Sequence, residues 1–145
     1  YEFKQIVNSD GTHSWDLASI AAPEALLMFA NDTAYSVNEQ ESVFEFGPPR
    51  KVEFEFQLPT WLRKPTLLKR VDADGLHDVK WTDHGKSVTI NDTRSLDAIY
   101  IAANNTAIFD AIEARRLLAI AHEQANAVDV DQLKDTVQLK VPNQP

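Results

Sequence analysis

The sequence predicts a mainly β fold, an antiparallel β-sandwich of the immunoglobulin-like or jelly-roll-like kind, followed by one C-terminal α-helix. Three observations lead to this fold class. Short runs of alternating apolar and polar residues recur between turn residues, and the clearest is KVEFEFQL at 51–58. No helical segment separates these runs, although the crossovers of a parallel sheet would need one. The stretch 107–125 then lacks Gly and Pro, which is typical of a helix.

The first half of the chain predicts a series of short strands with turn-forming residues between them. The apolar run at 24–30 is short for a helix, because Pro23 precedes it and a turn at Asn31-Asp32-Thr33 follows, so we expect a buried strand. The prolines at 48–49 must end the last strand of this half, since proline cannot donate to a sheet ladder. The expected strands are 3–7, 13–20, 24–30, 35–37 and 42–46.

The stretch 51–90 organises the second half. Phe54 and Phe56 alternate with glutamates, so one face of this strand is expected to be buried and the other solvated. A rigid elbow follows between Pro59 and Pro65, and later Asp-Gly and His-Gly pairs mark turns. The expected strands are 51–58, 66–71, 76–81, 86–90 and 96–102, with residues 91–93 as a loop.

We expect the sandwich to occupy residues 1–104 and a helix to occupy 105–126, packed on the sandwich or on a partner. Asn104 and the residues after it can cap this helix. Residues 127–145 are expected to form a tail, either an added strand or a linker, because Val137, Leu139 and Val141 alternate. The chain begins without Met, which we interpret as a sign of a fragment or a mature form.

Composition disfavours several classes of partner and chemistry. The formal net charge of −8 disfavours nucleic acid, because phosphate neutralisation needs clustered Lys and Arg. Cysteine is absent, which removes disulfides, thiolate nucleophiles and cysteine-bound metals. No run approaches the ~20 apolar residues of a membrane helix, so no membrane partner is expected. The oligomeric state stays open.

We predict no catalytic residue, no cofactor and no metal ligand. Glu53 and Glu55 lie two residues apart, a spacing that a glycosidase pair can use, but the alternation of a half-buried strand explains them better. The DADG sequence at 72–75 is similar to the start of a calcium loop, yet it lacks the third acidic residue and the closing Glu, so a turn is expected. His77 and His84 flank a turn across which they could approach, without a further ligand for zinc.

Three aromatic residues are candidate contact residues for a carbohydrate or for an adjoining domain: Trp61, Trp81 and Tyr35. Indole rings pack on the CH faces of sugars, but tryptophans also fill the cores of sandwiches. Trp81 lies at the end of an expected strand and is assigned to the core. Trp61 lies in the proline elbow, so we expect it to be exposed and to meet a partner surface or a sugar.

Several segments carry a family resemblance. They are EALLMFANDTA at 24–34, LPTWL at 58–62, TLLKRVDADG at 66–75, HDVKWTDHGKSVTI at 77–90 and DAIYIAAN at 97–104. Together, and mainly over 51–103, they resemble the C-terminal accessory β-sandwich domains of glycoside hydrolases. The long helix after Ala103 departs from that family, whose accessory domains do not normally need one.

The resemblance implies a non-catalytic support domain that packs against a catalytic barrel and contributes no catalytic residue. It favours a secreted or periplasmic location and leaves a cytoplasmic one open. Two alternatives also remain open at this point. One is a free-standing carbohydrate-binding module, and the other is a structural or adhesion-type sandwich that binds proteins.

Overall fold

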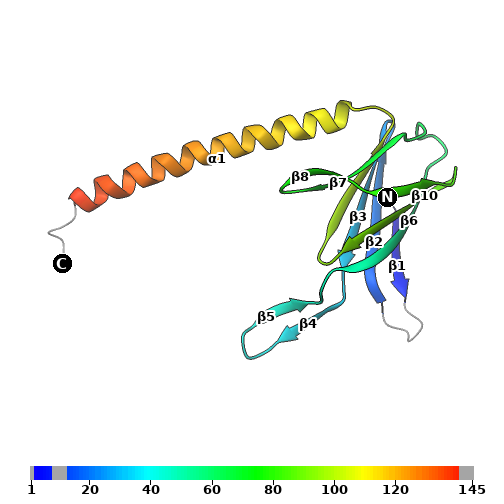
Figure 1. Cartoon of the computed structure of the whole chain (residues 1–145), viewed down its shortest axis with the longest axis horizontal. Helices are drawn as coiled ribbons and strands as arrows, with labels where there is room; N and C mark the ends of the chain where they lie inside the picture. The colour runs from blue at the N-terminus through cyan, green and yellow to red at the C-terminus, as the bar shows by residue number, and fades with distance from the viewer. Residues whose placement is uncertain (1, 8–12, 141–145) are drawn as a thin grey trace. The chain divides into compact units, whose positions relative to one another are not determined.

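The computed structural model describes residues 2–7 and 13–140, and within them it contains strands and one helix (Figure 1). The elements are β1 (Glu2–Val7), β2 (His13–Ala22), β3 (Ala25–Asp32), β4 (Tyr35–Asn38), β5 (Val43–Phe46), β6 (Arg50–Gln57), β7 (Leu67–Asp72), β8 (Gly75–Asp78), β9 (Lys80–Asp83), β10 (Ser87–Arg94), β11 (Ala98–Ala103) and α1 (Ala107–Lys140). The predicted fold class, mainly antiparallel β with a C-terminal helix, is confirmed.

The strands form two larger sheets and a separate hairpin. The six-stranded sheet has the order β1-β2-β3-β11-β7-β8, and the three-stranded sheet has the order β6-β10-β9. Strands β4 and β5 pair only with each other within the described residues, and Figure 1 shows this hairpin extending away from the larger sheets. All pairings are antiparallel, as a sheet built without crossover helices requires.

The hydrophobic core is built from residues of both larger sheets. Phe54 and Phe56 are buried on β6, while the glutamates between and beside them are exposed, as the alternation predicts. Phe54 packs edge-on against Trp15 of β2, with ring centroids 5.0 Å apart. Tyr100 of β11 is fully buried and also packs against Phe54, in a tilted arrangement with ring centroids 6.0 Å apart. Trp15, Phe54 and Tyr100 therefore join the six-stranded sheet to the three-stranded one.

Two expected elements differ from the structure. The expected strand at 76–81 is divided at Val79, so that β8 belongs to the six-stranded sheet and β9 to the three-stranded one. The expected loop at 91–93 is wrong, because β10 continues to Arg94 and pairs along its whole length with β6. The polar triplet Asn-Asp-Thr suggested a turn, but all three residues pair with β6 in the ladder.

The helix is longer than expected. It runs from Ala107 to Lys140, so residues 127–140 are helical and do not form an added strand. The reason is visible in the sequence, since Pro142 is the first Gly or Pro after the helix begins. Residues 141–145 lie outside the described residues. The chain divides into two compact units, Tyr1–Ile108 and Phe109–Pro145.

In the described part of the chain, α1 does not combine the length and hydrophobicity that a membrane-spanning helix needs.

The predicted helix start is supported by a cap, because the backbone N–H of Ala107 donates to Oδ1 of Asn105 at 2.9 Å. This bond satisfies one of the orphan amide groups at the start of a helix.

Candidate functional site

The proline elbow displays Trp61 on a fixed backbone. Its turn is closed by the backbone N–H of Leu62, which donates to the carbonyl oxygen of Pro59 at 3.1 Å. Leu62 packs against the core and Pro65 is buried, whereas the side chain of Trp61 is 59% exposed. The prediction that Trp61 is the exposed tryptophan is confirmed.

Further hydrogen bonds tie the elbow to the six-stranded sheet on either side. The backbone N–H of Arg63 donates to the carbonyl of Pro23, in the turn between β2 and β3, at 3.3 Å. The backbone N–H of Thr66 donates to the carbonyl of Ala103, at the end of β11, at 2.9 Å. The exposed indole therefore belongs to a segment anchored to three strand ends, and it does not depend on a loose loop.

Two basic side chains follow Trp61, and we call the three residues Trp61, Arg63 and Lys64 the elbow patch. Arg63 forms an exposed ion pair with Glu24 at 3.5 Å, and Lys64 forms one with Asp83 at 3.5 Å. The pKa of Asp83 lies below its usual value, mainly because its carboxylate accepts the backbone N–H of Gly85, with a smaller contribution from Lys64. The patch thus combines an aromatic ring with two basic side chains, each of which is paired with a carboxylate.

The three predicted aromatics do not form one surface. Trp81 of β9 is partly buried and packs against the core, which agrees with its assignment to the core. Tyr35 begins β4, before β6, and Trp61 follows β6. Because β6 spans eight residues at ~3.3 Å each, it places these two rings at opposite ends of the sandwich.

Tyr35 instead belongs to an aromatic cluster on the β4–β5 hairpin. The register pairs Tyr35 with Phe46 and Val37 with Phe44, which puts these four residues on one face. All four are exposed, with 63% of Phe44 and 55% of Val37 open to solvent. We call this the hairpin face. The sequence predicted a strand at 42–46, but it did not indicate that this face would remain uncovered.

The rings of the hairpin face pack at steep angles to one another. Tyr35 meets Phe44 edge-on, with centroids 5.2 Å apart and planes at 83°. Tyr35 and Phe46 are 5.5 Å apart with planes at 49°. These contacts are favourable aromatic geometries. They leave no pair of coplanar rings among the three.

A partly buried ion pair clamps the base of the hairpin. Asp32, the last residue of β3, has no exposed side-chain surface, and Arg50 opens β6 on the other side of the hairpin. Arg50 donates to Asp32 from Nη1 at 3.2 Å and from Nη2 at 3.0 Å. The Arg50 guanidinium also lies 4.6 Å from the centre of the Trp15 ring, a cation–π contact. The expectation of a surface turn at Asp32 is therefore wrong.

Backbone groups complete the environment of Asp32. Its carboxylate accepts the N–H of Ala34 at 2.9 Å and the N–H of Leu96 at 2.9 Å. Burial by itself would raise the pKa of Asp32, but the hydrogen bonds from Arg50 and these two amides, with the charge of Arg50, hold it below its usual value. Leu96 has a positive φ of 65°, so the clamp also fixes a backbone conformation that L residues rarely adopt.

A second polar network lies between the sheets. Asp92 of β10 accepts hydrogen bonds from Nη1 of Arg70 at 2.7 Å and from the hydroxyl of Tyr100 at 2.9 Å. Burial, and then the charge of Asp92, raises the pKa of Tyr100 far above its ordinary value. Arg70 also approaches Asp72, whose carboxylate accepts a hydrogen bond from Nε2 of His77 at 2.8 Å. Through Asp92, this network links β10 of the three-stranded sheet to β7 and β11 of the six-stranded sheet.

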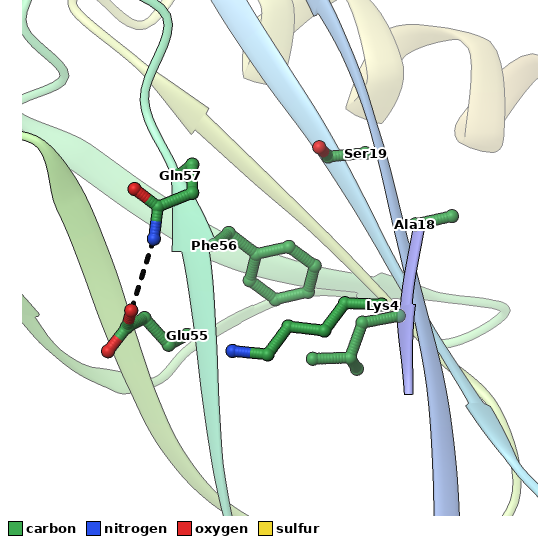
Figure 2. A pocket seen from close by; sticks show the side chains of 7 residues that line it. Lys4, Ala18, Ser19, Glu55, Phe56 and Gln57 are labelled. Atoms are coloured by element: carbon green, nitrogen blue, oxygen red, sulfur yellow. Dashed lines mark hydrogen bonds between the residues drawn. The ribbon is translucent and has the colours of Figure 1, made fainter. Parts of the chain in front are cut away.

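The clearest pocket opens between the six-stranded sheet and the edge of β6, and Figure 2 shows Lys4 reaching across it toward Phe56 and Glu55. Ser19 and Gln57 supply the other polar groups of its lining, and Gln57 donates to Glu55 at 3.1 Å. Glu53 lines a different hollow from Glu55, although both glutamates lie on the exposed face of β6. Glycoside hydrolysis needs two carboxyl groups that flank the glycosidic bond to be cleaved.

The remaining candidates for chemistry make separate structural contacts. His77 hydrogen-bonds Asp72, and His84 hydrogen-bonds the hydroxyl of Thr89 at 2.9 Å. The backbone N–H of Asp74 donates to Asp72 at 2.9 Å, and Gly75 has a φ of 123°, which is the geometry of a turn. Among the residues that the structure describes, no three His, Asp or Glu side chains gather where they could hold a metal ion.

Comparison with known proteins gives no relative for this chain: no family model, no curated protein and no solved structure matches it.

Proposed function

We propose that the chain is a non-catalytic β-sandwich domain that supports an adjoining catalytic domain in a larger carbohydrate-active protein. The single observation that carries the packing role is the exposed Trp61 on its anchored elbow. The carbohydrate-active context rests on the sequence resemblance to accessory domains of glycoside hydrolases. The contact surface in this proposal is the elbow patch.

The composition and rigidity of the elbow patch support a protein contact. Trp and Arg are the residue types that most often dominate binding energy at protein interfaces. A backbone that is already fixed loses little entropy when a partner binds it. The elbow meets this condition, because Leu62, Arg63 and Thr66 all hold it through the contacts described above.

A free-standing carbohydrate-binding module is the second candidate, because an exposed indole can also stack on a sugar. Further aromatic rings coplanar with this indole would extend it into a flat sugar-binding platform. Trp81 packs against the core and Tyr35 lies at the other end of β6, so neither extends the surface of Trp61. This placement favours the domain contact over the sugar platform.

Hydroxyl-radical footprinting of Trp61 separates the two candidates. The oxidation rate of Trp61 is measured in the chain alone, in the chain with cello-, xylo- and manno-oligosaccharides, and in the whole protein that its reading frame encodes. The support role predicts protection in the whole protein and none from the sugars. Protection by a sugar alone would favour the binding module, and equal oxidation in all three samples would contradict both.

A further inference from the structure

We infer that the hairpin face is a second interaction surface, which docks into an apolar cleft bordered by Lys and Arg on another protein. This surface is Tyr35, Val37, Phe44 and Phe46, at the opposite end of the sandwich from the elbow patch. The inference does not depend on a catalytic neighbour or on the role of Trp61.

The first argument is the exposure of so much apolar surface in one place. The register puts all four side chains on the same face of a two-stranded ladder, and each of them is exposed. Contiguous apolar patches of this kind are uncommon on monomeric proteins unless they bind something. An isolated two-stranded hairpin is also only marginally stable in water, so a partner that covers one face would stabilise it.

The second argument is that the hairpin is held at its base. The Asp32–Arg50 pair joins the residue that ends β3 to the residue that opens β6, on either side of the hairpin. Tyr35 packs against both Phe44 and Phe46, which fixes the rings relative to one another. A preorganised apolar arm loses less conformational freedom on docking than a loose loop would.

The third argument identifies the chemistry of the partner. The segment 33–49 contains Glu39, Glu41 and Glu45 and neither Lys nor Arg. A cleft with a basic margin would complement these charges and would increase the rate of association. A second copy of the chain would bring the same glutamates together, within molecules that each carry a net charge of −8. An anionic lipid surface would be repelled in the same way.

Ring geometry argues against a sugar as the occupant. Stacking of a flat pyranose face would need an open aromatic plane, but Phe44 meets Tyr35 at 83° and Phe46 meets it at 49°. A wedge of tilted rings instead fits the concave surface of a protein cleft, into which apolar anchors insert.

The test uses a probe that carries the predicted chemistry, a labelled amphipathic Leu/Lys peptide of about 18 residues, or about five helical turns. A Leu/Glu peptide of the same pattern is the charge control. Binding to the chain is measured by fluorescence anisotropy for the wild type, for Phe44→Ser alone, and for Val37→Ser with Phe44→Ser. The matched control is Ile20→Ser with Ile99→Ser, which removes two exposed apolar side chains from the six-stranded sheet.

We expect the wild type to bind the Leu/Lys peptide at least about tenfold more tightly than the Val37/Phe44 variant, a difference of about 1.4 kcal/mol. The Ile20/Ile99 variant and Trp61→Ala should bind like the wild type, and added salt should weaken binding. Equal binding by the hairpin variants, or equal binding of the Leu/Glu peptide, would overturn the inference. If the proposal for the elbow patch fails, these expected binding results stay the same.

Two further measurements test the other occupants. Sedimentation velocity would reveal a dimer, and flotation with phosphatidylcholine or phosphatidylglycerol vesicles would reveal membrane binding. A dimer or vesicle complex that disappears in Phe44→Ser would assign the hairpin face to a second copy or to lipid and would overturn the basic-cleft partner. Monomeric chain that does not float, together with hairpin-dependent binding of the Leu/Lys peptide, supports it.

Discussion

Nη2 of Arg50 lies 3.0 Å from Oδ1 of Asp32, and the Asp32 side chain is closed to solvent. The pair connects the end of β3 to the beginning of β6, and the hairpin that carries the exposed aromatics lies between them. Arg50 also stacks on Trp15, so the clamp is attached to the core. A charge buried with several donors around it is costly to leave unpaired, which makes this contact a sensitive point for mutation.

Replacement of Asp32 by Asn should destabilise the chain by about 2–4 kcal/mol. Asn has nearly the same shape, but it leaves Arg50 without its carboxylate and faces amide N–H groups with an NH₂. The free energy of unfolding is measured by urea titration followed by circular dichroism. Glu53→Gln is the control, because Glu53 is exposed on β6 and should change stability by less than about 0.5 kcal/mol. Equal effects of the two substitutions would contradict the clamp.

Stability should fall in acid. The pKa of Asp32 is lower in the folded chain than its ordinary value of 3.8, and so is the pKa of Asp72. Burial alone would raise both pKa values, and the hydrogen bonds from Arg50 and from His77 are the largest of the effects that together outweigh it. A carboxylate whose pKa is depressed by folding stabilises the fold above the unfolded pKa, and this stability is lost as the pH falls through the folded pKa.

The free energy of unfolding should therefore change little between about pH 7 and pH 5 on account of these two groups, and decrease below about pH 4. Asp32→Asn should show a smaller decrease, because one of the depressed carboxyl groups is gone. Urea titrations at a series of pH values measure the slope. An identical slope in the variant and the wild type would show that Asp32 does not have a lowered pKa.

Leu96→Gly should stabilise the chain by about 1 kcal/mol, because an L residue in the left-handed region costs energy that glycine avoids. Leu96 has a φ of 65° and an exposed side chain, so little apolar contact is lost. Leu96→Ala is the matched control, since it removes the side chain but keeps the strained backbone. Thermal and urea unfolding of both variants give the comparison. Gains of the same size in Gly and Ala would locate the effect in the side chain and contradict the strain.

Trp61→Ala should leave the free energy of unfolding within about 0.5 kcal/mol of the wild type. Phe54→Ala should lower the free energy of unfolding by about 3–5 kcal/mol, because the Phe54 ring fills the core and its removal leaves a cavity. Urea titration of both variants tests this difference. A large loss of stability in Trp61→Ala would mean that the indole serves the chain's own core, and the elbow patch would then be rejected as a contact surface.

The strands were predictable because their inward and outward residues alternate. Phe54 and Phe56 are buried as the pattern indicates, and the Asp74-Gly75 turn forms where expected. The sequence did not indicate which distant strands pair. Strand β3 pairs with β11, and the run 76–81 changes sheet at Val79. These choices depend on tertiary packing, which local patterns do not encode.

The candidate site was predictable only in part. Trp61 was identified from its place between prolines, where a large apolar side chain has no strand face to pack on. Asp32 was overlooked, because Asn-Asp-Thr is a common turn sequence and its partner Arg50 is 18 positions away. The signal that could have found this pair was an acidic residue at the end of an apolar strand, Asp32, together with a basic residue at the start of the next long strand, Arg50.

The pairing of β3 has a consequence for the timing of folding. Its neighbour β2 is adjacent in sequence, but the amide that Asp32 binds at Leu96 is 64 positions further along the chain. Sheets built from such distant contacts fold slowly, on the order of milliseconds to seconds. In a chain synthesised from its N-terminus, the apolar β2–β3 hairpin must therefore wait for β11. The amide of Leu96 can reach Asp32 only after that wait, so the set of donors around this carboxylate is completed late.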